Sequence, residues 1–303
     1  MNLEFHTKMN ALGAEVLEGI NTGISTCEKD YKGLVIGNEG QNFSAGANLA
    51  MLFMFAGDQE FDEINLMIAQ FQNTMMRARY SSIPVVVATS GMALGGGCEL
   101  SLHADQIQAH AETYMGLVEV GVGLIPGGGG TKEMTLRASD SYRVGDVELN
   151  TLQDNFMTIA TAKVATSAEE ARQIGFVRTS DEITLNRARL LADAKQKVLE
   201  LHEAGYTQQA QRKDIKVQGK SGLALFEAGI AGMKYGNYIS DHDMKIARKI
   251  SWVMNGGDLS MPTEVSEQYL LDLEREAFLS LTGEPKTLER IHSILFKGKP
   301  LRN

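Results

Sequence analysis

Apolar residues recur at helical spacing in two segments near the start of the chain. Four-residue steps connect one set: Leu12, Val16, Ile20 and Ile24. A second apolar stripe alternates steps of three and four residues: Phe61, Ile64, Ile68, Phe71 and Met75. Positions three and four residues apart share one face of a helix. The pattern therefore predicts a helix over Ala11–Cys27 and a longer helix that begins at Phe61.

Short apolar runs bounded by breakers predict buried strands around these helices. Four runs are of this kind: Gly33–Gly37, Val85–Thr89, Ile107–Ala109 and Thr113–Met115. Gly95–Gly97 opens a helix that runs to about His103, and Gly127–Gly130 leads into another helix. Strands that alternate with helices through short connections indicate an α/β fold whose sheet is mostly parallel.

The pattern changes after Arg178, where four long helical segments follow one another. These segments are Glu182–His202, Leu223–Tyr235, Asp241–Asn255 and Glu264–Leu281. We therefore expect an α/β core over residues 1–178, a helical region over residues 179–303, and a frayed tail over Lys297–Asn303.

Composition narrows the class of protein. Of the 303 residues, 43% are hydrophobic and 22% are charged, which is ordinary for a globular chain. The net charge of −9, without a basic block, argues against nucleic-acid binding. No apolar run is long enough to span a bilayer, and the start of the chain does not resemble a secretory signal. Cys27 and Cys98 stand among apolar residues, so we expect a soluble cytoplasmic protein with reduced core cysteines.

Phe43–Leu49 follows a predicted strand and is rich in small residues. Small side chains let the backbone lie close to a ligand, so that an amide can point into a pocket. A tight turn between a strand and a helix accounts for the same composition. Both interpretations stay open for this segment taken by itself.

Glu99 follows three glycines in the first turn of a predicted helix. The exposed N–H groups at such a helix start can hold a phosphate or a developing enolate oxygen. A solvated glutamate that complements the helix dipole is the alternative. The apolar neighbours Cys98, Leu100 and Leu102 favour a buried helix, with Glu99 facing a pocket or a partner.

Glu119 is the only charged residue between Glu112 and Lys132. Desolvation in such an apolar, glycine-rich stretch favours the protonated carboxyl, which suits a proton donor near neutral pH. A glutamate in a surface turn is the alternative.

Other motifs do not carry chemistry. Asp214–Ser221 ends like a phosphate-binding loop but lacks its leading glycine. Asp241–Asp243 does not converge on a metal and is expected to be a solvated helix cap, so no metal site is expected. His103 and Asp105 are expected to be structural.

Several segments together resemble the crotonase (enoyl-CoA hydratase/isomerase) superfamily, over about Leu3 to Arg178. The similar segments are Thr7–Leu12, Phe43–Leu49, Gly95–Leu100, Glu119 with Ile125–Gly127, Ala165–Ala171 and Gly175–Val177. Each is a weak signal alone, but their order and spacing are specific. The resemblance implies a crotonase-like spiral of repeated ββα units, followed by the helical C-terminal region.

The resemblance also implies roles for individual residues. The backbone N–H groups of Ala47 and Gly96 would form an oxyanion hole for the thioester carbonyl. Glu99 and Glu119 would flank a catalytic water, one as base and the other as acid. Acyl-CoA would be the substrate, and no further cofactor is expected.

Residues for the coenzyme A arm follow from the same resemblance. The arm would pass the stretch that includes Ala45, Asn48, Leu49 and Ala50, and Lys8 would meet a phosphate. Asn48 departs from the family, which usually has aspartate there. The walls of the acyl pocket are expected on the segment after this loop, at Met51, Phe53 and Phe55, and on the helix from Asp58 onward.

The implied reaction is the syn addition of water to trans-2-enoyl-CoA, giving 3-hydroxyacyl-CoA in fatty-acid β-oxidation. An isomerase of the same fold and a non-catalytic assembly domain are the alternatives. Family members usually have an earlier strand and turn, and Met1–Phe5 matches their second strand. Residues 139–150 look like an insertion. The late start and the helical tail are similar to hydratase modules fused to a 3-hydroxyacyl-CoA dehydrogenase, so we expect a dehydrogenase domain upstream in the full-length protein. The resemblance to the family, whose members often form trimers or dimers of trimers, also implies a homo-oligomer.

Overall fold

The computed structural model describes residues 1–143 and 145–303. The chain forms two compact units, and each unit draws on three stretches of chain. Unit 1 comprises Met1–Asn48, Gln70–Leu117 and Val164–Ala210. Unit 2 comprises Leu49–Ala69, Val118–Lys163 and Gln211–Asn303. The sequence predicts a division at residue 178 between an α/β core and a helical region. This division stays a prediction.

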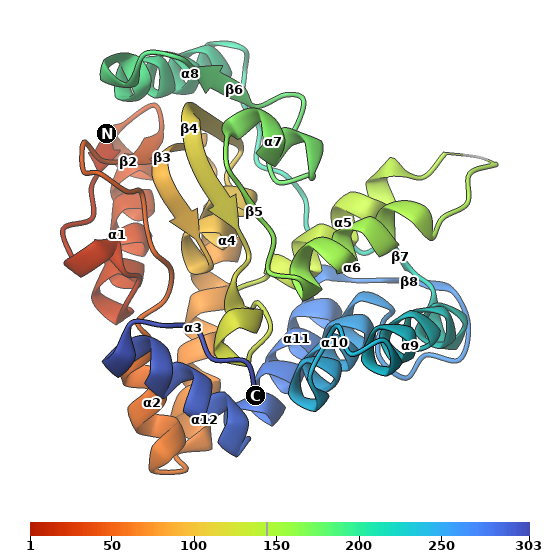
Figure 1. The fold of residues 1–303 in the computed structure, drawn as a ribbon. Helices are drawn as coiled ribbons and strands as arrows, with labels where there is room; N and C mark the ends of the chain where they lie inside the picture. Colours follow the sequence, from red (N-terminus) through yellow and green to blue (C-terminus); the bar gives the residue numbers. More distant parts are fainter. Residues whose placement is uncertain (144) are drawn as a thin grey trace. The chain divides into compact units, whose positions relative to one another are not determined.

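A six-stranded sheet forms the centre of unit 1 (Figure 1). Its strands are β1 (Asn2–Leu3), β2 (Leu34–Gly37), β3 (Val85–Leu94), β4 (Gln106–Gly116), β5 (Val164–Ala165) and β6 (Glu182–Thr184). The strands β1, β2, β3 and β4 lie in that order and pair in parallel, and β6 pairs in parallel with β4. Only the pairing of β5 with β4 is antiparallel among the described strands of this sheet. The predicted parallel α/β fold is confirmed.

The strands β3 and β4 are longer than the apolar pattern predicts. β3 continues past Thr89 to Leu94, and β4 joins the predicted strands Ile107–Ala109 and Thr113–Met115. The two strands pair with each other on both sides of a register shift between Thr89 and Gly91. Hydrogen bonds to a neighbouring strand keep polar residues extended, which an apolar pattern in one sequence cannot show.

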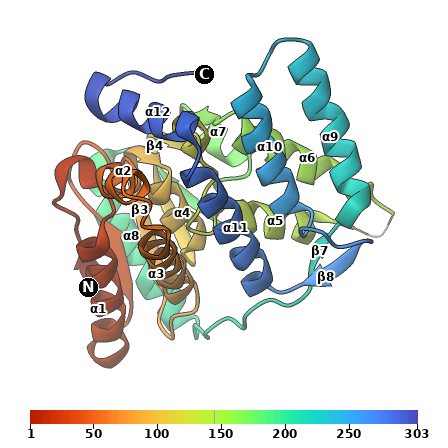
Figure 2. The same ribbon diagram turned by 90° about the horizontal axis from the view of Figure 1, so that it is seen from below.

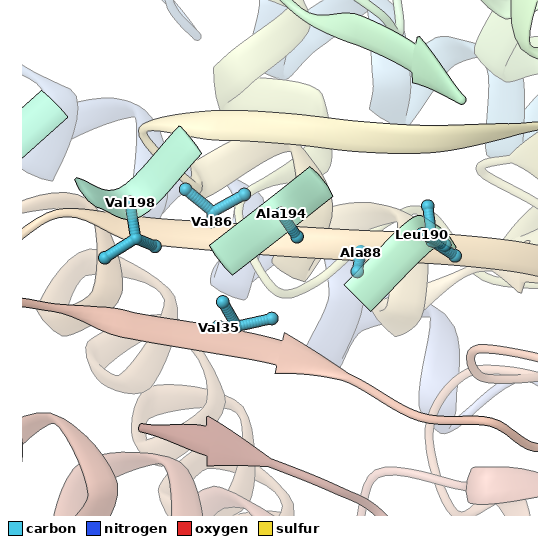
Figure 3. Packing of buried hydrophobic residues seen from close by; sticks show 6 residues of the cluster. All are labelled: Val35, Val86, Ala88, Leu190, Ala194 and Val198. Atoms are coloured by element: carbon cyan, nitrogen blue, oxygen red, sulfur yellow. The ribbon is translucent and has the colours of Figure 1, made fainter. Parts of the chain in front are cut away.

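Helix α8 (Leu190–Glu203) covers one face of β2 and β3 (Figure 3). Six buried side chains make this contact: Val35, Val86, Ala88, Leu190, Ala194 and Val198. The three helical members recur at four-residue steps and so share one face. The prediction of one helix over Glu182–His202 is wrong at its start, because residues 182–184 pair with β4 as the strand β6.

The remaining helices of unit 1 flank the sheet. They are α1 (Ala14–Asp30), α4 (Gly96–His103), α7 (Ala168–Gln173) and the second part of α3 (Phe61–Arg79). Helix α1 begins later than the predicted Ala11, because Leu12 instead forms a bridge with Ala47. Of its predicted apolar face, Ile20 and Ile24 are buried and Val16 is half-buried, and α3 begins at Phe61 as expected. Cys27 and Cys98 are free and buried, which confirms their assignment to the core.

Asp105 connects three parts of unit 1. Its carboxylate accepts hydrogen bonds from the Val85 N–H at 2.8 Å and from the Tyr206 hydroxyl at 3.0 Å. Burial raises the pKa of Asp105 to about 6, although these hydrogen bonds act in the opposite direction. His103 lies nearby in sequence, with Nδ1 at 2.7 Å from the Glu99 carbonyl oxygen. The structural role expected for both residues is confirmed.

Unit 2 is mostly helical. Its helices are α2 (Leu49–Gly57), the first part of α3, α5 (Gly130–Ser141), α6 (Asn150–Ala160), α9 (Gly219–Tyr235), α10 (Asp241–Met254), α11 (Glu267–Thr282) and α12 (Pro285–His292). The strands β7 (Ile215–Val217) and β8 (Thr263–Val265) pair antiparallel. Helix α10 lies beside α9 and α11, as Figure 2 shows. The helical character was predicted for residues 179–303, and the structure has the helices α8, α9, α10, α11 and α12 in that range.

Two details of the helical prediction are wrong. The segment from Glu264 was expected to be helical, but β8 extends to Val265 and α11 starts at Glu267 with the Ser266 side chain as its N-cap. The tail was expected to fray, but the Asn303 side chain accepts from Arg290 Nε at 2.8 Å. A side-chain hydrogen bond therefore fixes the last residue, although a polar chain end is usually expected to be mobile.

Short helical turns complete the described chain. Three are 3-10 helices, Lys8–Asn10, Glu119–Val122 and Arg187–Arg189, and Ser293–Lys297 is a π-helical turn. Over residues 1–143 and 145–303, none of the helices has both the length and the apolar character that crossing a bilayer requires. The predicted insertion over residues 139–150 includes Val144, which lies outside the described residues, and it stays a prediction.

Candidate active site

The segment Phe43–Asn48 runs between the end of β3 and the N-terminal stretch of unit 1. On one side, the Ser44 N–H donates to the Met92 carbonyl at 2.9 Å, and the Leu94 N–H donates to the Ser44 carbonyl at 3.0 Å. These bonds extend the sheet pairing of β3 to a loop 50 residues earlier in the sequence. The loop is therefore held as rigidly as an extra short strand.

Ala47 is held from the other side by Leu12. The Leu12 N–H donates to the Gly46 carbonyl at 2.8 Å, and the Asn48 N–H donates to the Leu12 carbonyl at 3.2 Å. Backbone groups alternate in direction along an extended segment, so the N–H of Ala47 points away from Leu12. Ala47 itself is exposed.

The start of helix α4 meets this loop. Gly95 precedes the helix with a φ of 52°, which side chains rarely tolerate, and its N–H donates to the Gly116 carbonyl at 2.8 Å. A Cβ on Gly96 would lie 3.5 Å from the Ala47 nitrogen and 2.7 Å from Phe71 Cζ. Among the described residues, no hydrogen bond is found from the N–H of either Ala47 or Gly96. The structure thus brings together the two predicted oxyanion donors.

Glu99 lies in the first turn of α4 and is 3% exposed. Every residue of α4 is buried, so the prediction of a buried helix is confirmed. The solvated-glutamate alternative is therefore excluded for Glu99.

Glu119 is the first residue of the 3-10 helix Glu119–Val122 and is half-buried. Its carbonyl accepts from the Leu124 N–H at 3.0 Å, which closes the turn. Glu119 belongs to unit 2, whereas Glu99 belongs to unit 1. The meeting of the two carboxylates at one water stays a prediction.

The residues predicted to hold the coenzyme A arm divide between the units. Lys8 is exposed in a 3-10 helix, and the next residue, Met9, accepts from the Ala45 N–H at 3.1 Å. This bond brings the segment that carries Lys8 to the loop, and Asn48 is exposed nearby on the same loop. Leu49 and Ala50 begin helix α2 in unit 2.

Helix α2 also carries the residues predicted to line the acyl pocket. Met51 is exposed, while Phe53 and Phe55 are half-buried. The Phe53 ring centroid lies 6.0 Å from the rings of both His292 and Phe296. Helix α2 therefore packs on the end of α12, and its role in a pocket stays a prediction.

A buried carboxylate that the sequence interpretation missed holds the glycine turn after Glu119. Glu274 on α11 accepts from the N–H groups of Gly129 at 2.5 Å and Lys132 at 3.0 Å, and its side chain is fully buried. It therefore caps the N-terminus of α5 from a different helix. Lys132 is also fully buried, with Nζ at 2.9 Å from Glu267 Oε2.

The sequence does contain a signal for these buried carboxylates. Glu267 and Glu274 are seven residues apart, and they fall on the apolar stripe of α11 together with Leu270, Leu271, Ala277, Phe278 and Leu281. An acidic residue on the core face of a helix is expected to have a buried partner.

The segment Asp241–Asp243 is a helix cap as predicted, but only Asp241 is solvated. Ser240 and Asp243 form a capping box at the start of α10, while His242 is 3% exposed and Asp243 is 7% exposed. Burial and the nearby Arg290 cation lower the pKa of His242 to about 4. No group of three or more His, Cys, Asp or Glu side chains in the described part of the chain is placed to hold a metal ion.

Comparison with known proteins places the chain in a family. Residues 1–227 match the family model described as enoyl-CoA hydratase/isomerase. Helices α10, α11 and α12 follow the matched residues. An enoyl-CoA hydratase from Bacillus halodurans has a similar fold, with a TM-score of 0.64 at 16% identity, over 96% of this chain and 95% of that one.

Two relatives are longer proteins. One from Bacillus subtilis, named Probable 3-hydroxyacyl-CoA dehydrogenase, is 50% identical over 301 residues, which are 99% of this chain and 38% of the relative. One from Rickettsia felis carries the name of a fatty acid oxidation complex trifunctional enzyme. It is 31% identical over 95% of this chain and 36% of its own length. The chain thus spans less than two fifths of either relative.

Proposed function

Because the chain belongs to the enoyl-CoA hydratase/isomerase family, we propose that it adds water to trans-2-enoyl-CoA and so forms 3-hydroxyacyl-CoA. One observation carries the proposal: the backbone at Ala47 and Gly96 converges beside the first turn of the helix that carries the buried Glu99. A thioester carbonyl oxygen bound by both N–H groups would lie at the positive end of α4.

The proposed chemistry needs charge stabilisation on that oxygen. When the oxygen of water bonds to the β-carbon, the π electrons of the double bond move toward the thioester and leave an enolate. Donors already oriented toward the developing oxyanion contribute about 3–4 kcal/mol each. The rigid pairing of Phe43–Asn48 with β3 and Leu12 means that little reorganisation is needed.

Two proton transfers complete the addition. One carboxylate takes a proton from the attacking water, and the other gives a proton to the α-carbon, so that H and OH add across the double bond. We assign these roles jointly to Glu99 and Glu119, because two carboxylates that share one water titrate as a pair. The second candidate function, double-bond isomerisation, needs proton transfer but no attacking water, and one carboxylate suffices for it.

Recognition of coenzyme A is assigned to the loop and its neighbours. Lys8 supplies a cation for a phosphate, and Ala45, Asn48, Leu49 and Ala50 line the path of the arm. The hydrogen bond between Ala45 and the residue after Lys8 supports a common surface for these groups. The substrate supplies the only coenzyme in this scheme.

The names of the longer relatives support a larger assembly. We propose that this chain corresponds to the hydratase part of a protein that also carries 3-hydroxyacyl-CoA dehydrogenase activity, so that one part consumes the product of the other. The position of such a dehydrogenase domain, a homo-oligomeric state and a cytoplasmic location stay predictions.

Turnover of a short trans-2-enoyl-CoA tests the proposal, followed through the loss of absorbance of the conjugated thioester. Replacing Glu99 or Glu119 with Gln should leave binding nearly unchanged and lower kcat by about 10²–10⁴-fold. Glu112→Gln, at an exposed position on β4, is the matched control and should keep the wild-type rate.

Each alternative has its own result. Gain of absorbance from a 3-enoyl-CoA, without hydration, would favour the isomerase. A folded protein that turns over neither substrate would favour the assembly domain. If both glutamine variants keep the full rate, the two-carboxylate mechanism is wrong.

A further inference from the structure

Helix α12 holds two carbonyl groups of the turn that carries Glu119. Arg290 Nη1 donates to the Val120 carbonyl at 3.1 Å, and the Thr287 hydroxyl donates to the Gly123 carbonyl at 2.9 Å. These contacts join residues more than 160 positions apart in the sequence. Thr287 and Arg290 are three residues apart, so they share the face of α12 that meets the turn.

Arg290 is itself fixed on several sides. The residue is 1% exposed, and its Nη2 lies 2.8 Å from Asp243 Oδ1 on α10. Asp243 belongs to the capping box of α10, which limits its own freedom. A buried, planar guanidinium with a buried carboxylate partner keeps a defined orientation. Its bond to Val120 is therefore a rigid support.

Thr287 receives a second constraint from His242. The Thr287 hydroxyl has one proton, which it donates to Gly123, so it accepts from His242 Nε2 at 3.0 Å. The pKa of His242, lowered by burial, leaves the imidazole neutral at physiological pH, with its proton on Nε2. A chain of hydrogen bonds thus runs from α10 through α12 to the turn.

The fit between Thr287 and the turn is close. Gly123 has a φ of 86°, and a Cβ on this residue would lie 2.8 Å from the Thr287 Cα. Only glycine allows this approach without displacing α12 or straining the backbone. The turn therefore ends at Gly123, whose carbonyl accepts the hydrogen bond from the Thr287 hydroxyl.

We propose that Thr287 and Arg290 are positioning residues for the Glu119 carboxylate. They touch no reacting atom, but they fix the four-residue helix that begins at Glu119, and a catalytic group displaced by about 1 Å can lose about 10²-fold in rate. The inference rests on the proposed hydration. It adds that turnover requires α12, because this helix holds the turn that carries Glu119.

Hydroxyl removal in Thr287→Val and charge removal in Arg290→Gln test the proposal in the full chain. We expect kcat for a short trans-2-enoyl-CoA to fall by about 10–100-fold while KM changes by less than about twofold, because the enoyl thioester still binds. Thr287→Ser retains the hydroxyl and should recover most of the rate. Lys286→Gln, at an exposed position on the same helix, is the matched control.

A double-variant comparison separates positioning from general loss of structure. In the Glu119→Gln background, Thr287→Val should cause no further loss of the residual rate, because the group that Thr287 positions is already removed. Circular dichroism must show that each variant is folded. Equal fold-losses in the two backgrounds, an unchanged kcat in both single variants, or a parallel rise in KM would each overturn the proposal.

The outcome for wild-type protein separates this inference from the proposed function. Wild-type turnover with unaffected Thr287 and Arg290 variants would overturn the positioning role alone. A folded wild-type protein without hydratase turnover would overturn the proposed function, and the positioning role with it.

Discussion

Replacing Glu274 with Gln should destabilise the protein through the glycine turn before α5. The two carboxylate oxygens accept from the N–H groups of Gly129 and Lys132, and the side chain is fully buried. An amide offers one acceptor oxygen and one NH2 group. One backbone N–H would therefore lose its acceptor and face a second donor, without water to replace it.

The magnitude follows from these contacts. A hydrogen bond to a charged group contributes about 1.5–3 kcal/mol, and a carboxylate at a buried helix N-terminus contributes up to about 2 kcal/mol through the helix dipole. The substitution removes one such bond and the charge, so the expected loss is about 3 kcal/mol. Since the variant keeps the size of the side chain, a cavity contributes little to this figure.

Urea unfolding followed by circular dichroism measures the effect. With an m-value of about 3 kcal/mol/M, the midpoint should fall by about 1 M. Glu276→Gln is the matched control, because Glu276 is exposed on the same helix two residues away. If the two variants have the same midpoint within error, the capping role of Glu274 is refuted.

Two further predictions concern the oxyanion donors and pH. Gly96→Ala places a methyl group 2.7 Å from Phe71 Cζ and beside the Ala47 amide, so hydration should slow by about 10²-fold or more. Gly19→Ala, with open space at its Cβ, is the control and should keep the wild-type rate. Equal rates for the two variants would contradict the oxyanion assignment. The contribution of His242 to stability should be lost as pH decreases from 6.5 toward about 4, because the unfolded state protonates His242 first, and His242→Gln should remove this contribution of up to about 3 kcal/mol. Asp105 acts with the opposite sign, because its raised pKa means that stability falls as pH increases from about 4 to about 6, and Asp105→Asn should remove that loss. Urea unfolding at several pH values measures both terms, and a pH-independent difference from wild type would contradict either one.

The sequence predicts elements well where local pattern and tertiary contacts agree. The apolar stripe from Phe61 predicts the start of α3, and the glycines at 95–97 predict the start of α4. Both signals are local, because each lies within one turn or a few turns of the helix itself. Glu182–Thr184 was expected to be helical but is a strand, because its pairing partner β4 lies more than 70 residues earlier. A short strand at the edge of a sheet has little local signal.

The candidate site divides in the same way. Ala47, Gly96 and Glu99 follow from short motifs whose small residues and helix start are visible in the sequence. Thr287 and Arg290 were missed, because their only link to Glu119 is a contact across more than 160 residues. Lys132 was treated as the polar boundary of an apolar stretch. No residue near it in the sequence indicates that its buried partner is Glu267 on α11.

The parallel sheet of unit 1 has a consequence for how the protein acquires its structure. Parallel neighbours cannot be joined by tight turns, so β2 and β3 begin about 50 residues apart, and β6 begins more than 70 residues after β4. Contacts between such distant segments carry a large loop-closure entropy before any pairing energy is gained, which makes folding slow. During synthesis, the backbone edge of β4 that pairs with β6 must wait for residues 182–184 to leave the ribosome. A chaperone that shields this edge should raise the yield of native protein more than one that acts only after release.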